Sequence, residues 1–190
     1  MNVARTAERQ EQPGMSRIHV GMLLFLLSET FLFGNLFWTY FYLRAKSPVW
    51  PPQGVILDLP LIAVNTIILL SSSITMQLAI NNARRGSLRG MARALIVTMF
   101  LGAIFLTIKG WEWTHGDFRP WDHAYGSIFY TLTGFHGLHV LVGIGMLLVI
   151  MLRTLRMPKI APLYIEAGGL YWHFVDLIWI FVFTSLYIIR

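Results

Sequence analysis

Residues 125–152, "YGSIFYTLTGFHGLHVLVGIGMLLVIML", decide the fold. The stretch contains no Asp, Glu, Lys or Arg. A helix rises about 1.5 Å per residue, so a helix of this length exceeds the roughly 30 Å hydrocarbon core of a bilayer. We therefore predict a membrane-spanning helix here.

Four further apolar stretches have spanning length, at residues 19–43, 59–80, 92–113 and 165–189. The whole chain of 190 residues is 56% hydrophobic and only 13% charged, with a mean hydropathy of +0.61. This composition excludes an ordinary soluble domain. We predict an all-α bundle of five transmembrane helices over residues 19–190, preceded by a flexible tail over residues 1–18.

The connections between the apolar stretches are short, and most contain Pro or Gly, so we expect neighbouring helices to pack antiparallel. Ten of the 15 Lys and Arg residues fall in the tail and in the second and fourth connections. By the positive-inside rule the N-terminus is cytoplasmic and the C-terminus is outside. This distribution explains the net charge of +6 without a nucleic-acid partner.

The chain contains no cysteine, which excludes disulfides, thiolate metal sites and iron–sulfur clusters. The basic connections can also contact lipid phosphates. The candidates for such contacts are Arg84, Arg85, Arg153, Arg156 and Lys159.

Several ionisable residues fall inside the predicted spans, where a charge costs about 2.5–3.5 kcal/mol on insertion scales. Glu29 and Asp176 lie near mid-membrane depth. Glu166, His173 and Asp176 share an arc of roughly 80° on the fifth span, so that face must meet protein. Glu112, with Lys109, occupies the last turn of the third span, where it meets protein or the interface.

Two interpretations stand for each of these groups. Glu29 is either a protonatable group that helps to exchange protons or a neutral acid hydrogen-bonded inside the bundle. His136 and His139 share one side of the fourth span and are either haem or copper ligands or hydrogen-bond partners of adjacent helices. The second interpretation is favoured, because the further ligands that a metal site needs are missing. His173 and Asp176 are either a proton relay or a link between helices.

Specific strings add a resemblance to a known family. "YGSIFYTLTGFHGLHVLVG" (125–143) and "EAGGLYWHFVDLIWIFVF" (166–183) resemble the signature of haem-copper oxidase subunit III. "LSETFLFGNLFWTYFYLRA" (27–45) resembles the helix that bears the family's carbodiimide-reactive glutamate, which matches Glu29. "KGWEW" (109–113) resembles the segment that bears a further family glutamate, which matches Glu112.

The resemblance implies a core subunit of a proton-pumping cytochrome c oxidase, which reduces oxygen to water. The subunit would have no catalytic residue, metal or cofactor of its own, because haem and copper belong to subunits I and II. It would contact mainly subunit I, bind phospholipid, and support proton uptake, stability and assembly. Longer family members have two more helices at the start, so the five-helix form implies a bacterial cytoplasmic membrane.

Other functions stay open. The five-helix form also occurs in quinol oxidases and in proteins associated with nitric oxide reductase, and nothing in the sequence identifies the electron donor. A small proton-coupled carrier is disfavoured, because no paired repeats or interrupted midplane helices are evident. A haem-binding membrane anchor is a third possibility.

Overall fold

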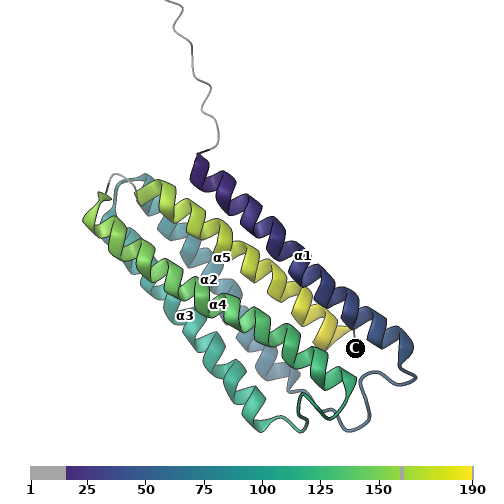
Figure 1. Ribbon diagram of the computed structural model, residues 1–190. Helices are drawn as coiled ribbons and strands as arrows, with labels where there is room; N and C mark the ends of the chain where they lie inside the picture. The colour runs from purple at the N-terminus through teal and green to yellow at the C-terminus, as the bar shows by residue number, and fades with distance from the viewer. Residues whose placement is uncertain (1–15, 159–160, 190) are drawn as a thin grey trace, which may run out of the picture.

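The computed structural model describes residues 16–158 and 161–189. Five long α-helices run side by side in these ranges, and the described residues form no strand (Figure 1). They are α1 (Arg17–Lys46), α2 (Leu59–Arg84), α3 (Leu88–His115), α4 (Ala124–Arg156) and α5 (Ala161–Phe183), which continues as the π-helix η2 (Thr184–Ile188). All five are long and apolar enough to cross a membrane. The predicted all-α bundle of five spans is confirmed.

Polar caps make the helices longer than their apolar stretches. The Ser16 side chain accepts a hydrogen bond from the backbone N–H of His19 at 3.3 Å, and α1 therefore begins at Arg17. Residues 17 and 18 thus belong to the helix and not to the predicted tail, whose residues 1–15 lie outside the described ranges. Asp58 caps α2 in the same way, and Ser87 caps α3 directly after Gly86, which turns the chain with a φ of +70°.

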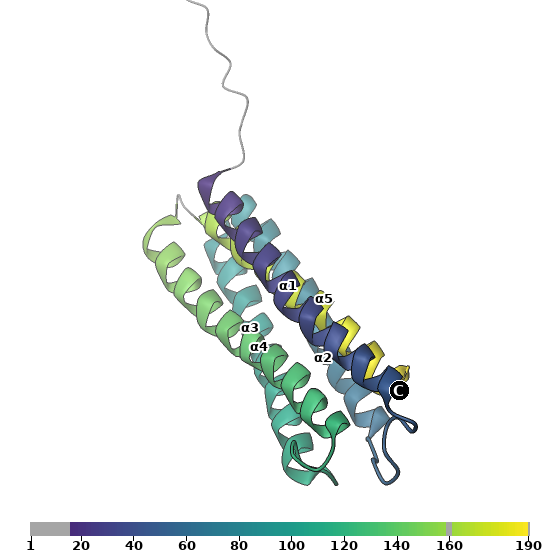
Figure 2. The same ribbon diagram turned by 45° about the vertical axis from the view of Figure 1, so that its right-hand side comes forward.

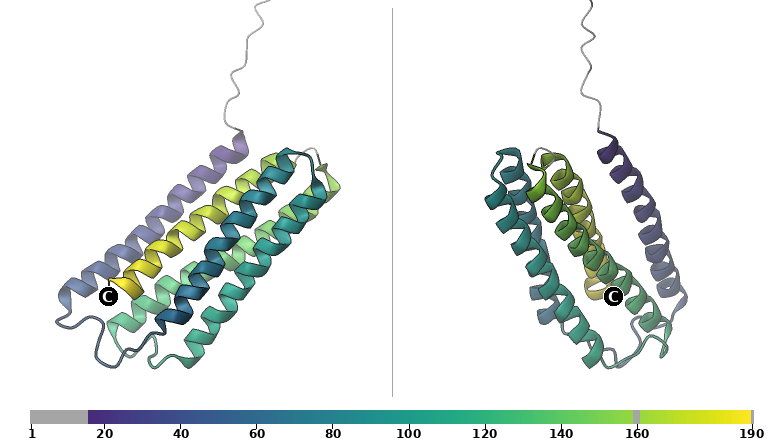
Figure 3. Two further views of the ribbon diagram at one scale, coloured as in Figure 1. Left: turned by 180° about the vertical axis from the view of Figure 1, so that it is seen from behind. Right: turned by 60° about the vertical axis from the view of Figure 1, so that its left-hand side comes forward.

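The central helix of the bundle is α5, which packs against α1, α2 and α4 (Figures 1 and 2). Seen from behind, α2 and α3 lie together on the face away from α1 (Figure 3). The expectation that α1 packs against the next helix is wrong, because α1 contacts mainly α4 and α5. The connection between α1 and α2 spans residues 47–58, long enough to carry the chain past α5 to the far side of the bundle.

Two tryptophans of α5 form the centre of the core. Trp172 and Trp179 are 1% and 0% exposed, and each donates its indole N–H to a hydroxyl of α2, on Ser72 at 2.9 Å and on Thr66 at 3.0 Å. Because the indole nitrogens have partners, the rings gain apolar contact without leaving a buried donor unpaired. These contacts fix the rotation of α5 against α2.

Glycines allow the helices to approach each other. Gly134 and Gly137 of α4 face α3, near Trp113 and Leu106, with only modest crowding. An added Cβ at Gly102 would lie 2.8 Å from Trp172, and one at Gly143 would lie 3.1 Å from the same ring. Close approaches of both α3 and α4 to α5 are therefore built around Trp172.

Two tyrosine hydroxyls donate hydrogen bonds to backbone carbonyls at the end of the last helix. The hydroxyl of Tyr40 on α1 donates to the carbonyl of Ser185 at 2.5 Å, and the hydroxyl of Tyr125 on α4 donates to the carbonyl of Leu186 at 3.0 Å. The last carbonyls of a helix have no partner within the helix. Trp50, from the connection after α1, packs its ring against both tyrosines and donates to the Tyr40 oxygen at 3.3 Å.

The outer surface of α1 is apolar. Leu24, Phe31 and Trp38 recur every seven residues and are 64%, 67% and 74% exposed. Only 6% of the most apolar window of α1 is buried within the chain, against 56% for α5. Such a surface suits lipid or another transmembrane subunit.

Candidate functional site

The candidate site consists of polar groups distributed along the interior of the bundle, and the predicted ionisable residues other than His136 lie in four clusters.

Glu29 of α1 and His139 of α4 form a direct link between helices. Glu29 Oε2 lies 2.8 Å from His139 Nε2, and both side chains are about one-seventh exposed, at 14% and 13%. His139 Nδ1 lies 2.7 Å from the backbone carbonyl of Phe135. A carbonyl can only accept, so Nδ1 carries a proton and the link to Glu29 shares one further proton. That proton resides on the carboxyl as a neutral pair or on the imidazole as an ion pair.

His136 lies three residues from His139 but in a different environment. It is 0% exposed, and its ring packs against Phe105 of α3 and Trp179 of α5 with ring centres 5.6 and 4.8 Å away. Within the described part of the chain, neither of its nitrogens has a hydrogen-bond partner. The two histidines face different helices and do not converge on one point. No group of three or more His, Asp or Glu side chains that could hold a metal is found among the described residues.

His173 and Asp176 of α5 meet at a residue that the sequence did not single out. Ser73 of α2 lies 3.0 Å from His173 Nδ1 and donates a hydrogen bond to Asp176 Oδ2. Asp176 is only 3% exposed. The predicted pair is therefore connected through a hydroxyl on the neighbouring helix.

Glu166, the third residue on this face of α5, lies near the start of the helix. Its Oε1 accepts from Arg84 Nε of α2 at 2.7 Å, and its Oε2 lies 3.5 Å from His19 Nε2 of α1. Three helices are thus joined at this end of the bundle. Arg84 is also one of the candidates for lipid-phosphate contact, and its side chain is 59% exposed.

The other lipid-phosphate candidates in the described ranges, Arg85, Arg153 and Arg156, are exposed. They belong to the C-terminal ends of α2 and α4, which lie at the same end of the bundle (Figure 1). Lys159 lies outside the described residues.

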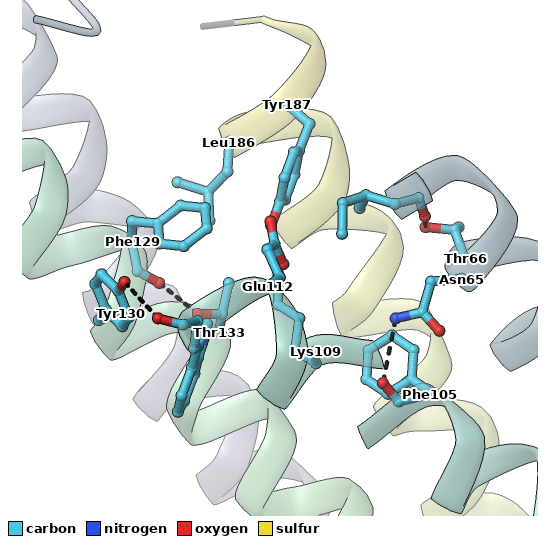
Figure 4. A network of polar contacts seen from close by, with 12 residues as sticks. Asn65, Thr66, Phe105, Lys109, Glu112, Phe129, Tyr130, Thr133, Leu186 and Tyr187 are labelled. Atoms are coloured by element: carbon cyan, nitrogen blue, oxygen red, sulfur yellow. Dashed lines mark hydrogen bonds and ion pairs between the residues drawn. The ribbon is translucent and has the colours of Figure 1, made fainter. Parts of the chain in front are cut away.

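Glu112 of α3 belongs to a buried cluster at the opposite end (Figure 4). Its carboxylate forms an ion pair with Lys109 one turn earlier and accepts from the Tyr187 hydroxyl at 2.9 Å. Lys109 also donates to the Tyr187 oxygen. Lys109 is 3% exposed, and its Nζ lies about 5 Å from the ring centres of Phe129, Trp179 and Tyr187. Of the two placements left open for this turn, the protein interior is therefore the one adopted.

Sequence inspection placed Lys109 beside Glu112, since residues three apart meet on a helix, but it missed Ser73 and Tyr187. The sequence gives no signal for Tyr187 and Ser73, because their partners are 78 and 103 residues away.

These clusters, on five spanning helices, define a polytopic membrane protein whose interior polar groups connect one helix to another. The model of the family described as "Cytochrome c oxidase subunit III" matches residues 6–190. The chain belongs to this family.

Curated relatives agree with the family match. The chain is 37% identical over 181 residues to "Cytochrome c oxidase subunit 3" of Felis catus, covering 90% of this chain and 69% of that protein. It is 36% identical to the protein of the same name from Equus caballus, with the same coverage. It is 39% identical to that of Emericella nidulans, with 66% of the relative covered. These relatives are mammalian and fungal and do not bear out the bacterial origin that the five-helix form implies.

Proposed function

We propose that this chain is a non-redox subunit III of a proton-pumping haem-copper oxidase in a bacterial cytoplasmic membrane, where it supports the subunit that reduces oxygen. Family membership supports the oxidase assignment. The proposed partners are subunit I, as the main contact, and subunit II, with phospholipid around the bundle. Haem and copper would reside in those two subunits. In support, His136 and His139 of α4 face different helices, and the described residues contain no three-residue ligand group.

The Glu29–His139 link is the observation that carries the proposed role in proton uptake. Because His139 Nδ1 donates to the Phe135 carbonyl, the contact between His139 Nε2 and Glu29 holds one exchangeable proton between α1 and α4 at mid-helix depth. The same link joins the most peripheral helix to the rest of the bundle. One pair can therefore serve both proton exchange and stability.

Replacing Glu29 with Gln separates the two roles. Glutamine can still donate an N–H to His139 Nε2, so the link between helices is kept while the exchangeable proton is lost. If the pair exchanges protons during turnover, the purified oxidase containing Glu29→Gln will show lower turnover or fewer protons pumped per electron, with α1 still in place. Unchanged values across pH would reduce Glu29 to a link between helices. Glu29→Leu is the comparison variant, because it loses both the link between the helices and the exchangeable proton.

Copurification tests the assignment as a whole. We expect an affinity-tagged chain to bring down a complex with haem and copper, and the isolated chain after dissociation to contain neither. The partner proteins and the electron donor that the complex oxidises would distinguish cytochrome c oxidase from quinol oxidase and nitric oxide reductase systems. Proton transport by the chain alone in vesicles, or a haem spectrum retained by it alone, would contradict the proposal.

A further inference from the structure

A polar cavity opens between α1, α2 and α5 at the end of the bundle where α5 begins. Its volume is about 260 Å³, and its lining combines charged and polar groups with two apolar side chains. The lining residues are His19, Gln77, Ile80, Arg84, Glu166, Leu170 and His173. His173 lies deepest along α5, seven residues after Glu166, which corresponds to roughly 10 Å of helix.

The hydrogen bonds beyond His173 have a defined direction. Ser73 has a single hydroxyl proton, and it donates that proton to Asp176 Oδ2. The contact of 3.0 Å between Ser73 Oγ and His173 Nδ1 must therefore be a bond in which Nδ1–H donates to the hydroxyl oxygen. In neutral His173 this leaves Nε2 as the basic nitrogen of a ring that borders the cavity.

Asp176, at the inner end of this series of hydrogen bonds, lacks part of the solvation that a carboxylate needs. It is 3% exposed, and its Oδ1 has no hydrogen-bond partner within the described residues. It lies ten residues after Glu166, so it sits roughly 15 Å along the helix from the mouth of the cavity. Buried carboxyl groups in membrane spans are costly when charged and seldom lack a partner.

We propose that His173, Ser73 and Asp176 form a proton relay that connects the cavity with a buried proton-accepting site at Asp176. A proton from water in the cavity binds Nε2 of His173, and the Nδ1 proton passes to the Ser73 oxygen. The original hydroxyl proton of Ser73 passes at the same time to Oδ2 of Asp176. The serine ends neutral, the carboxylate becomes a carboxylic acid, and His173 returns to a neutral imidazole with its proton on Nε2.

The groups around the relay favour such an entry. The charged and titratable side chains that face the cavity are His19 from α1, Arg84 from α2 and Glu166 from α5, and Arg84 and Glu166 neutralise each other at 2.7 Å. Glu29 is not one of them, because His139 of α4 holds it. The relay is thus separate from the Glu29–His139 link, and it stands whether or not the chain supports an oxidase.

Infrared spectroscopy of the full chain in lipid nanodiscs tests the relay. In samples at low pH, where Asp176 has taken up its proton, we expect a carboxylic acid C=O band that is lost in Asp176→Asn and that shifts rapidly when the sample is transferred to D₂O. In Ser73→Ala and in His173→Gln the shift should be slower, on the order of a hundredfold, because a positioned proton carrier is removed. Ser73→Thr keeps the hydroxyl and should restore rapid exchange.

Matched control variants distinguish the loss of the relay from a general loosening of the helix bundle. Ser71→Ala removes a hydroxyl from the same helix that donates to the backbone carbonyl of Ile67 in its own helix, and should leave exchange unchanged. Glu29→Gln should leave the Asp176 band in place. The proposal is overturned if Asp176→Asn removes no carboxylic acid band, or if exchange is equally fast in Ser73→Ala, His173→Gln and the unaltered chain.

Discussion

At the scale of single residues, Trp172 is a side chain with little room to move. Glycines from two different helices, Gly102 on α3 and Gly143 on α4, face its ring, and Ser72 on α2 holds its indole nitrogen at 2.9 Å. The ring is a rigid plane held from three sides, so a new methyl group cannot be accommodated by a simple rotation. Packing at this point is therefore specific to glycine.

Gly102→Ala should destabilise the bundle by roughly 1–3 kcal/mol, because its Cβ would lie 2.8 Å from the Trp172 ring. Gly145→Ala on α4 is the matched control, since an added Cβ there meets nothing within 4 Å and alanine favours the helix. Unfolding of the purified protein by denaturing detergent measures both. Equal stability of the two variants would contradict the close contact at Trp172.

The Lys109–Glu112 pair is a second residue-scale feature with a measurable effect. Glu112→Gln leaves the Lys109 ammonium buried without its counter-charge, which should cost roughly 3–5 kcal/mol. The double replacement Lys109→Met with Glu112→Gln should recover much of that loss, because no buried charge then remains unpaired. Unfolding of the unaltered chain, of Lys109→Met, of Glu112→Gln and of the double variant gives the coupling free energy. A double variant no more stable than Glu112→Gln would show that the unpaired charge of Lys109 is not the cause of the lost stability.

At the scale of helices, η2 is the element that depends most on others. It ends the last span, and its carbonyls at Ser185 and Leu186 are bonded by tyrosines from α1 and α4. The end of the last helix therefore holds its shape through helices more than 60 residues earlier in the chain.

Tyr40→Phe should loosen η2, because the Ser185 carbonyl loses its donor while the ring stays in place. We expect faster backbone hydrogen exchange over residues 184–188 and a loss of about 1 kcal/mol in stability. Tyr42→Phe, two residues away with an exposed side chain, is the control and should change neither. Exchange over η2 that is the same in both variants would contradict the capping role.

The helices themselves could be predicted from the sequence, but their contacts could not. Apolar runs of spanning length need no tertiary information, so all five appeared, with ends displaced by a few residues because caps such as Ser16 lie in polar segments. Hydropathy does not say which helices pack together, and α1 accordingly lies against α4 and α5. The same limit hid Ser73, whose importance depends wholly on α5 lying beside α2.

At the scale of the whole molecule, charge should set the orientation. The predicted cytoplasmic N-terminus rests on the excess of Lys and Arg in alternate connections. Successive helices run in opposite directions, so successive connections lie at opposite ends of the bundle (Figure 3). In a membrane, the two ends would therefore face different aqueous phases. The polar cavity beside Glu166 would then open to the cytoplasm.

Single cysteines can test this orientation, because the chain has none of its own. Met157→Cys lies in the connection before α5 and Trp121→Cys in the connection before α4, and both positions are well exposed, at 59% and 80%. In intact cells an impermeant thiol reagent should label Trp121→Cys and spare Met157→Cys, with the pattern reversed in inverted vesicles. The opposite pattern would reverse the predicted topology.

The central position of α5 has a consequence for how the protein is made. During translation α5 leaves the ribosome after the four helices that precede it, yet it supplies the partners of Ser72, Thr66 and Ser73. Until it inserts, those hydroxyls of α2 lack the indole and carboxyl groups that occupy them in the finished bundle. A nascent chain stalled before residue 161 would thus be a natural target for membrane quality-control proteases.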